Sequence, residues 1–186
     1  MSQSMRGKAA TQPTTTSSAV RNSLFRLTLS SEIFIAASPQ RLWEIITDFA
    51  AYGGWNQAIP SATGEATAGS VLRVLIHWPG LKRSHYELDV LTASPAHELR
   101  WLGHFGIKGL MDGDHRFLLE AVGADTTRLT QTECFSGALI PVFAPWLRDN
   151  VLSGFDQMNL ALKARAEQPP LATPVRESAL PRSSAI

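Results

Sequence analysis

The residues best suited to chemistry meet if two late segments of the chain pair as a hairpin. Segments 111–122 and 126–137 both alternate apolar and polar residues, as strands do, and residues 123–125 between them favour a turn. Pairing about that turn sets His115 opposite Glu133. A histidine held by a carboxylate can exchange protons with a bound molecule when the pair lines a cavity. His115 and Glu133 are therefore the candidate catalytic residues.

The same register predicts which side chains share the inner face of the hairpin. Glu120 then faces Arg128 as an opposite-charge pair on the outer face, while Phe117 faces Gln131 on the inner face. The inner face is apolar near the turn and polar at its far end. Two interpretations stay open for the polar end. It forms a polar spot inside a ligand pocket, or the histidine and glutamate bond each other or the backbone at a water-facing rim.

Strand patterns fill most of the chain before this hairpin. A helix is predicted from Pro39 to about residue 51, because Ser38 is a good N-cap and proline suits the first turn. The connector 52–59 could hold a second short helix. Further strands are predicted at 24–36, 71–78, 84–92 and 97–105, with a weaker one at 61–66. Short turns between consecutive strands indicate an antiparallel sheet of six to seven strands, and the separation of helices from the strand run indicates an α+β fold.

The last long helical pattern runs from Leu147 to Glu167, between Pro145 and Pro169. One apolar stripe recurs along it at i, i+4, i+7 and i+11, formed by Val151, Phe155, Met158 and Leu162. A helix with such a stripe must bury it, and the sheet is the only large surface predicted in this chain. We therefore expect this helix to lie across the sheet.

Large aromatic side chains fall on the predicted inner faces of the strands. Trp78, Trp101 and Phe105 either fill the space under the helix or line a cavity there. Trp55 either walls the mouth of such a cavity or belongs to the core. The loops 79–81 and 105–110 contain glycine and are either mobile loops at the mouth or plain hairpin turns.

The composition argues against several functional classes. A net charge of +1 argues against a nucleic-acid-binding protein. The chain contains no run of 18 apolar residues, so no transmembrane helix is predicted. The single cysteine, Cys134, rules out an internal disulfide and favours a reducing, cytoplasmic location. No Cys/His cluster has metal-ligand spacing, and Asp112 with Asp114 falls short of a calcium loop. We expect no metal and no other cofactor.

The domain is predicted to span residues 23–168. Residues 1–22 and 169–186 lack apolar periodicity and are predicted to be disordered tails. The first tail is basic and rich in Ser and Thr, a composition that organelle transit peptides share with ordinary bacterial or cytosolic tails.

Several motifs, in the right order, resemble the SRPBCC superfamily of START and Bet v 1-like proteins. The first is SPQRLWEIITDFAAYGGWN at 38–56, which is similar to the first-helix signature of that superfamily. Four later runs are similar to bacterial members labelled polyketide cyclase/dehydratase-like: ELRWLG, DGDHRFLLEAV, TRLTQTECFSG and GFDQMNLALKARAE. The resemblance covers about residues 29–168. Gly53 and Gly54, just before Trp55, depart mildly from the Tyr-Pro-x-Trp spacing that is usual in the superfamily. This departure affects only the expected shape of that loop.

The resemblance implies a helix-grip fold, in which a curved antiparallel sheet surrounds a long C-terminal helix and a cavity for small apolar or amphipathic molecules. The ligand-binding residues expected on this basis are Trp55, Trp78, Tyr86, Trp101, Phe105, Phe117, Gln131, Val151, Phe155, Met158 and Leu162. The partner expected is a small hydrophobic molecule, with no nucleic acid and no integral membrane segment. The sequence does not indicate the oligomeric state.

Three functions remain open at this point. The first is binding of a small hydrophobic ligand. The second is a polyketide cyclase/dehydratase-like enzyme, in which His115 acts as acid and base, Glu133 orients it, and Gln131 or Tyr86 binds an oxygen. The third is a protein-interaction accessory with a vestigial cavity. Fold alone does not choose among them.

Overall fold

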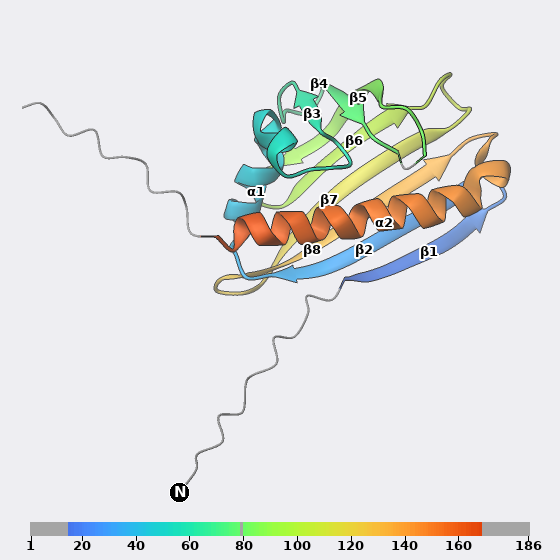
Figure 1. The fold of residues 1–186 in the computed structure, drawn as a ribbon. Coiled ribbons are helices and arrows are strands. Elements are labelled where there is room, and N and C mark those ends of the chain that lie inside the picture. Colours follow the sequence, from blue (N-terminus) through green and yellow to red (C-terminus); the bar gives the residue numbers. More distant parts are fainter. Residues whose placement is uncertain (1–14, 79, 169–186) are drawn as a thin grey trace, which may run out of the picture.

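The computed structural model describes residues 15–78 and 80–168, which form an eight-stranded antiparallel sheet and three helical segments (Figure 1). In chain order these are β1 (Thr16–Ser23), β2 (Arg26–Ile35), α1 (Pro39–Thr47), the 3-10 helix η1 (Phe49–Gly54), β3 (Ser61–Thr63), β4 (Val71–Ile76), β5 (Ser84–Ser94), β6 (Glu98–His104), β7 (Asp112–Gly123), β8 (Thr126–Ser136) and α2 (Ile140–Ala166). The strands lie in the order β1-β2-β8-β7-β6-β5-β4-β3. The predicted α+β helix-grip fold is confirmed, with one strand more than expected.

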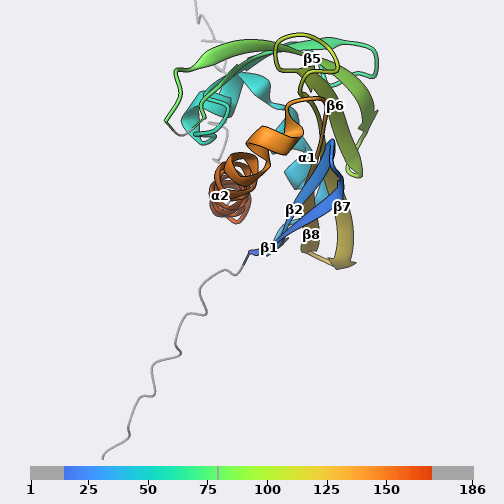
Figure 2. The same cartoon turned by 90° about the vertical axis from the view of Figure 1, so that its right-hand side faces the viewer.

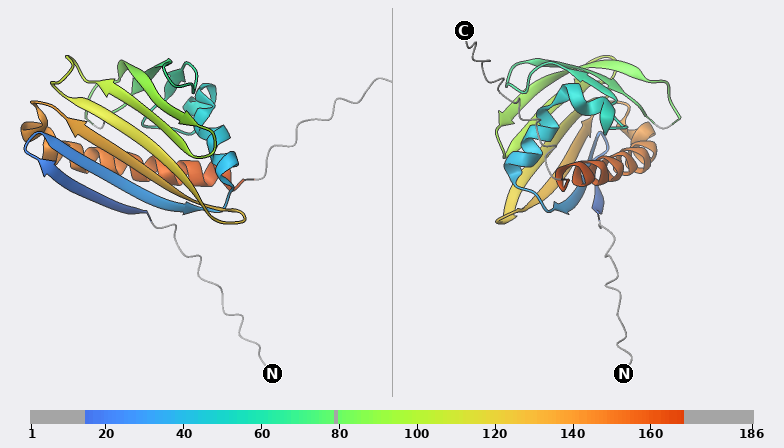
Figure 3. Two further views of the ribbon diagram at one scale, coloured as in Figure 1. Left: turned by 180° about the vertical axis from the view of Figure 1, so that it is seen from behind. Right: turned by 60° about the vertical axis from the view of Figure 1, so that its left-hand side comes forward.

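The sheet curves around α2, which crosses its concave face (Figures 1 and 2). The view from behind shows that no helix of the described residues covers the opposite face of the sheet (Figure 3, left). This one-sided cover explains the alternation of the strands, since every second side chain must face the helix. In β8, partly exposed and buried residues alternate along its whole length.

The predicted register of the hairpin β7–β8 is confirmed. His115 pairs with Glu133 on the inner face, and Glu120 pairs with Arg128 on the outer face. The Arg128 guanidinium donates to Oε2 of Glu120 at 3.0 Å, so the charge pair that suggested the register is formed. A bulge beside the turn leaves two residues, 124–125, at its tip in place of the expected three.

Strand β1 corrects the expectation that residues 1–22 form a disordered tail. Residues 16–23 pair with β2 at the edge of the sheet, and all eight are exposed. A strand exposed on both faces needs no apolar alternation, so its sequence carries no strand pattern. The hydroxyl of Ser17 also donates to Asp156 of α2 at 2.7 Å, which ties the edge strand to the helix. Residues 1–14 and 169–186 lie outside the described residues, so the tail prediction for them remains a prediction.

Helix α2 begins at Ile140, seven residues before the predicted start at Leu147. Pro141 lies in its first turn, and Pro145 is inside the helix instead of just before it. Pro145 lies near the N-terminus of α2, where the first four backbone N–H groups have no partner within the helix. A proline there therefore removes few helical hydrogen bonds and is tolerated. The added turns bury Ile140 and Ala144 and lengthen the apolar stripe. The predicted end is close to the observed one.

Two groups of buried apolar residues form the core. The larger lies between the sheet, α1, η1 and the C-terminal half of α2, and includes Leu42, Phe117 and Leu162. The smaller lies under the N-terminal half of α2 and includes Phe135 and Leu147. Trp78 and Phe105 are partly exposed and pack against both groups, so they mark the place where the two meet.

Candidate functional site

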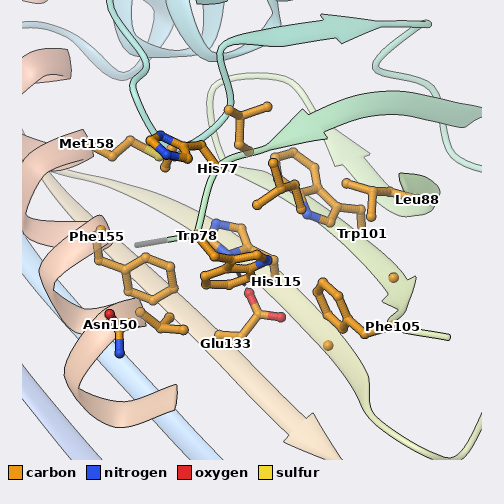
Figure 4. Close-up of a pocket in the computed structure, with 17 residues that line it drawn as sticks. His77, Trp78, Leu88, Trp101, Phe105, His115, Glu133, Asn150, Phe155 and Met158 are labelled. Carbon is orange, nitrogen blue, oxygen red and sulfur yellow. Dashed lines mark hydrogen bonds and ion pairs between the residues drawn. The ribbon is translucent and has the colours of Figure 1, made fainter. Parts of the chain in front are cut away.

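A cavity of about 80 Å³ lies between the inner face of the sheet and α2. Phe155 and Met158 reach it from the helix, and His115 and Glu133 reach it from the hairpin β7–β8 (Figure 4). Its wall is almost entirely apolar apart from this pair, Asn150 and His77. An apolar cavity with a few convergent polar groups is the usual form of a small-molecule site.

His115 and Glu133 are buried together under the helix. Their side chains join through a hydrogen bond of 2.7 Å between Nδ1 and Oε2, with His115 6% exposed and Glu133 8% exposed. Trp101 stacks on the imidazole at 5.1 Å between ring centroids, and Phe155 meets it edge-on at 5.1 Å. The pair therefore lies within the apolar interior and does not face water at the rim of the sheet, which was the other interpretation of the sequence.

The second ring nitrogen of His115 has no hydrogen-bond partner among the described residues, although it is buried. The carboxylate of Glu133 accepts from Nδ1, so this nitrogen carries a proton and Nε2 is left for other contacts. In the neutral ring Nε2 accepts a hydrogen bond, and in the imidazolium it donates one. Nε2 can therefore bind a hydroxyl, a carbonyl or an enolate oxygen.

The structure brings together six of the eleven residues expected to bind a ligand. These six line the cavity: Trp78, Trp101, Phe105, Val151, Phe155 and Met158. Three of the others support the wall or the core. Tyr86 packs against Phe105 at 5.0 Å, Phe117 meets the ring of His115 at 4.6 Å, and Leu162 is fully buried in the larger core group.

Trp55 does not line this cavity but lines two neighbouring pockets, one of which shares Ala58 and Met158 with the cavity. Its ring packs edge-on against Tyr52 at 5.1 Å. Full burial and the nearby Asp48 raise the pKa of Tyr52 well above its ordinary value, so its hydroxyl stays protonated and donates to the carbonyl of Ile46. Trp55 and Tyr52 thus brace the segment that follows α1.

Gln131 belongs to a buried polar chain that leads away from the cavity. Its Nε2 donates to Oδ1 of Asn159 at 2.7 Å, and Asn159 donates to the hydroxyl of Ser31 at 3.0 Å. Ser31 in turn donates to Asp156 at 2.7 Å. The chain satisfies most of the polar groups between β8, β2 and α2 and fixes the helix on the sheet. The second amide atom of Gln131, Oε1, has no partner among the described residues.

Some lining residues were not predicted from the sequence. Glycines make room at two of these positions, because a Cβ at Gly113 would collide with Oε1 of Glu133 and one at Gly103 would press on Leu88. Gly154 of α2 faces open space, with nothing within 4 Å of a Cβ there. Other unpredicted lining residues are Ala58, Ile59, Ile76, His77, Leu88 and Asn150. A glycine on the inner face of a strand is the one signal that could have pointed to the cavity.

The turn between β6 and β7 is held closed by Asp112. Its carboxylate is bonded to Nδ1 of His104 at 2.7 Å and accepts from the backbone N–H of Gly109 at 3.0 Å. Burial alone would raise the pKa of Asp112, but the bonds from His104 and Gly109 outweigh it and lower that pKa. Asp114 likewise accepts from Arg100, at 2.6 Å. Both aspartates are thus committed to neighbours on the outer face.

No helix among the described residues is long and apolar enough to cross a membrane. The part of the chain that the structure describes also contains no group of three His, Cys, Asp or Glu residues placed to hold a metal ion.

Solved structures share this fold at low sequence identity. A START superfamily protein from Mycobacterium smegmatis is 22% identical, with a TM-score of 0.63 over 76% of this chain and 97% of that one. The Zhui aromatase/cyclase from Streptomyces sp. R1128 is 18% identical, with a TM-score of 0.64 over 79% and 97%. The di-domain aromatase/cyclase BexL from the BE-7585A biosynthetic pathway is 15% identical, with a TM-score of 0.66 over 80% of this chain and 52% of that one, so this chain spans about half of it.

Family assignment comes from the sequence. A comparison with curated proteins gives no match. The family model described as polyketide cyclase/dehydrase and lipid transport matches residues 26–167, from β2 through the end of α2. That stretch includes the hairpin, the gripping helix and all the residues around the cavity. The chain therefore belongs to the polyketide cyclase/dehydrase and lipid transport family, within the SRPBCC superfamily.

Proposed function

We propose that this protein binds a small, largely apolar molecule under α2, with an oxygen of that molecule on Nε2 of His115. The single observation that carries the proposal is the unpartnered Nε2 at the wall of a largely apolar cavity. A buried polar atom without a partner costs about 1–3 kcal/mol. A ligand oxygen at this atom would recover that free energy, which an apolar ligand of the same shape could not do.

The size of the cavity limits what enters without a rearrangement. An apolar cavity of about 150 Å³ is known to hold benzene, and the present one has about 80 Å³. A larger ligand must displace side chains at the junction of the two core groups. Trp78 and Phe105 are the best placed, because both are only partly buried and their rings meet edge-on at 6.0 Å. We propose that these two rings move aside when the ligand enters.

Calorimetry with two probes of matched shape tests this proposal. The first, 1-naphthol, carries a hydroxyl, and the second, 1-methylnaphthalene, carries a methyl group in the same place. We expect 1-naphthol to bind more tightly by roughly 5- to 150-fold, the equivalent of satisfying one buried polar atom. The double variant His115→Phe/Glu133→Leu should abolish the preference while keeping an apolar wall, because it leaves neither Nε2 nor an unpaired carboxylate at the cavity. Equal binding of both probes to the unmodified protein would refute the role of Nε2.

A second candidate function is acid/base catalysis on an enolisable carbonyl compound. The observation that favours it is the orientation of His115, in which Glu133 holds Nδ1 and leaves Nε2 for the cavity. Nε2 would take a proton from a carbon beside a carbonyl, and the resulting enolate would add to a second carbonyl of the same molecule. The imidazolium would then return the proton to the new alkoxide. Such proton transfer contributes about 10²–10⁴-fold to a rate.

Cyclisation of a poly-β-ketone test substrate would distinguish the two functions. If His115 is the base, His115→Ala lowers the turnover by about 10²–10⁴-fold. Glu133→Gln should lower it less, because the amide oxygen can still hold Nδ1. A variant His115→Ala with full turnover would rule out this chemistry and leave ligand binding as the proposal.

A further inference from the structure

Four turns lie toward one end of the molecule, the right-hand end in Figure 1 and the near end in Figure 2. The strand directions bring them there, since β1, β4, β6 and β8 end at this side while β2, β5, β7 and α2 begin at it. We call this end the tip and define it by residues 21–26, 80–83, 105–111 and 137–143.

Backbone hydrogen bonds join three of the four turns. The N–H of Gly137 donates to the carbonyl of Phe25 at 3.1 Å, and the N–H of Ala138 donates to that of Gly109 at 3.2 Å. Gly137 has φ of +132° and lies against the backbone of Leu110, where a Cβ would collide. These contacts join the segments 21–26, 105–111 and 137–143 into one connected surface, although they are distant in the sequence.

The tip exposes large apolar side chains. Ile107 is 76% exposed and Val142 is 72% exposed. The tip holds six of the twelve large apolar side chains that stand exposed among the described residues, the other four being Leu24, Phe25, Leu81 and Phe143. Scattered single residues of this kind are normal on a protein surface, but a gathering at one end indicates an interaction site.

The tip is also basic. Its four segments contain five cationic residues and no Asp or Glu, although the whole chain has a net charge of only +1. All five are exposed, and none forms an ion pair with another described residue: Arg21, Arg26, Lys82, Arg83 and Lys108. A partner that neutralises these charges must be anionic, which argues against a second copy of the same surface.

We propose that the tip docks onto an anionic phospholipid membrane surface. Its six apolar side chains are spread over four turns, singly or as neighbouring pairs, so each turn can enter the interfacial region while the lysines and arginines between them contact the head groups. A flat protein interface would instead require a continuous apolar centre. Docking would also set the cavity close to the lipid, because Trp78 and Phe105 flank the same turns and line it.

This surface does not depend on the proposed ligand, and vesicles without any added ligand test it. We expect the full chain to cosediment with vesicles of phosphatidylcholine and phosphatidylserine, and not with phosphatidylcholine alone. Raised salt should release it, because salt screens exposed charges. Each basic residue near an anionic leaflet contributes about fivefold to binding, so the double variant Lys82→Gln/Lys108→Gln should bind roughly 25-fold more weakly.

A matched pair of variants separates the tip from the rest of the surface. Ile107→Asp should abolish vesicle binding, whereas Val122→Asp, at an exposed apolar residue near the end of β7 at the opposite end of the molecule, should leave it unchanged. Circular dichroism verifies that both variants fold. Equal loss in the two variants, or equal binding to both kinds of vesicle, would overturn the proposal. Binding to poly-glutamate without binding to vesicles would do so too, and would indicate an acidic protein partner.

Discussion

Removing one member of the His115–Glu133 pair should destabilise the protein far more than removing both. His115→Leu leaves a carboxylate buried and unpaired, which typically costs about 3–5 kcal/mol. Glu133→Leu leaves the Nδ1 donor without an acceptor, at a cost of about 1–3 kcal/mol. In the double variant two leucines meet in an apolar surrounding, and such replacements are close to neutral. The coupling free energy of the two sites is therefore expected to be at least about 3 kcal/mol.

Urea unfolding of the four proteins at neutral pH measures this coupling. Tryptophan fluorescence is a suitable signal, because Trp101 stacks on the imidazole. The four transitions should share one m-value, so that changes in the midpoint report stability alone. An exposed pair at the rim of the sheet would couple by only about 0–1 kcal/mol. A coupling below about 0.5 kcal/mol would refute the buried pair as the structure shows it.

Three further predictions concern the walls and the mouth of the cavity. Gly154→Ala should stabilise the helix by up to about 1 kcal/mol in urea unfolding, because its Cβ meets open space, while weakening 1-naphthol binding. Gly113→Ala should instead cost about 1–3 kcal/mol in the same assay, because its Cβ collides with Glu133 and Phe105. The pKa of Asp112 is lower in the folded state than the ordinary aspartate pKa of about 3.9. This difference stabilises the folded state fully at a pH above the ordinary pKa. The contribution is lost as the pH falls through the lower folded-state pKa. The protection factor of the Gly109 amide against hydrogen exchange, relative to the intrinsic rate at each pH, should therefore fall on acidification, and Asp112→Asn should already lack this protection at pH 5.

The hairpin was predictable from the sequence because two independent signals agree. Alternation fixed the faces of β7 and β8, and the Glu120–Arg128 pair chose the register. A slip of one residue would have turned every side chain to the wrong face. The position of His115 opposite Glu133 follows directly from that register, although only the structure shows that α2 buries the pair.

Other elements gave no readable signal. β1 is polar and exposed on both faces, so nothing in its sequence distinguishes it from a disordered tail. The early start of α2 was hidden by Pro145, which usually marks a helix boundary but lies near enough to the N-terminus to be accommodated. The polar chain from Gln131 through Asn159 to Ser31 joins three elements distant in sequence, and such contacts follow only from the packed fold.

The position of a bound oxygen at His115 is tested most directly by nuclear magnetic resonance of its ring nitrogens. Nε2 of His115 is followed while 1-naphthol is added to the full chain, with 1-methylnaphthalene as the control. We expect a large shift of the Nε2 signal with 1-naphthol only, together with shifts of Phe155 and Met158, which line the same cavity. An unchanged Nε2 signal at saturating 1-naphthol, or shifts confined to the outer face of the sheet, would contradict the proposed site.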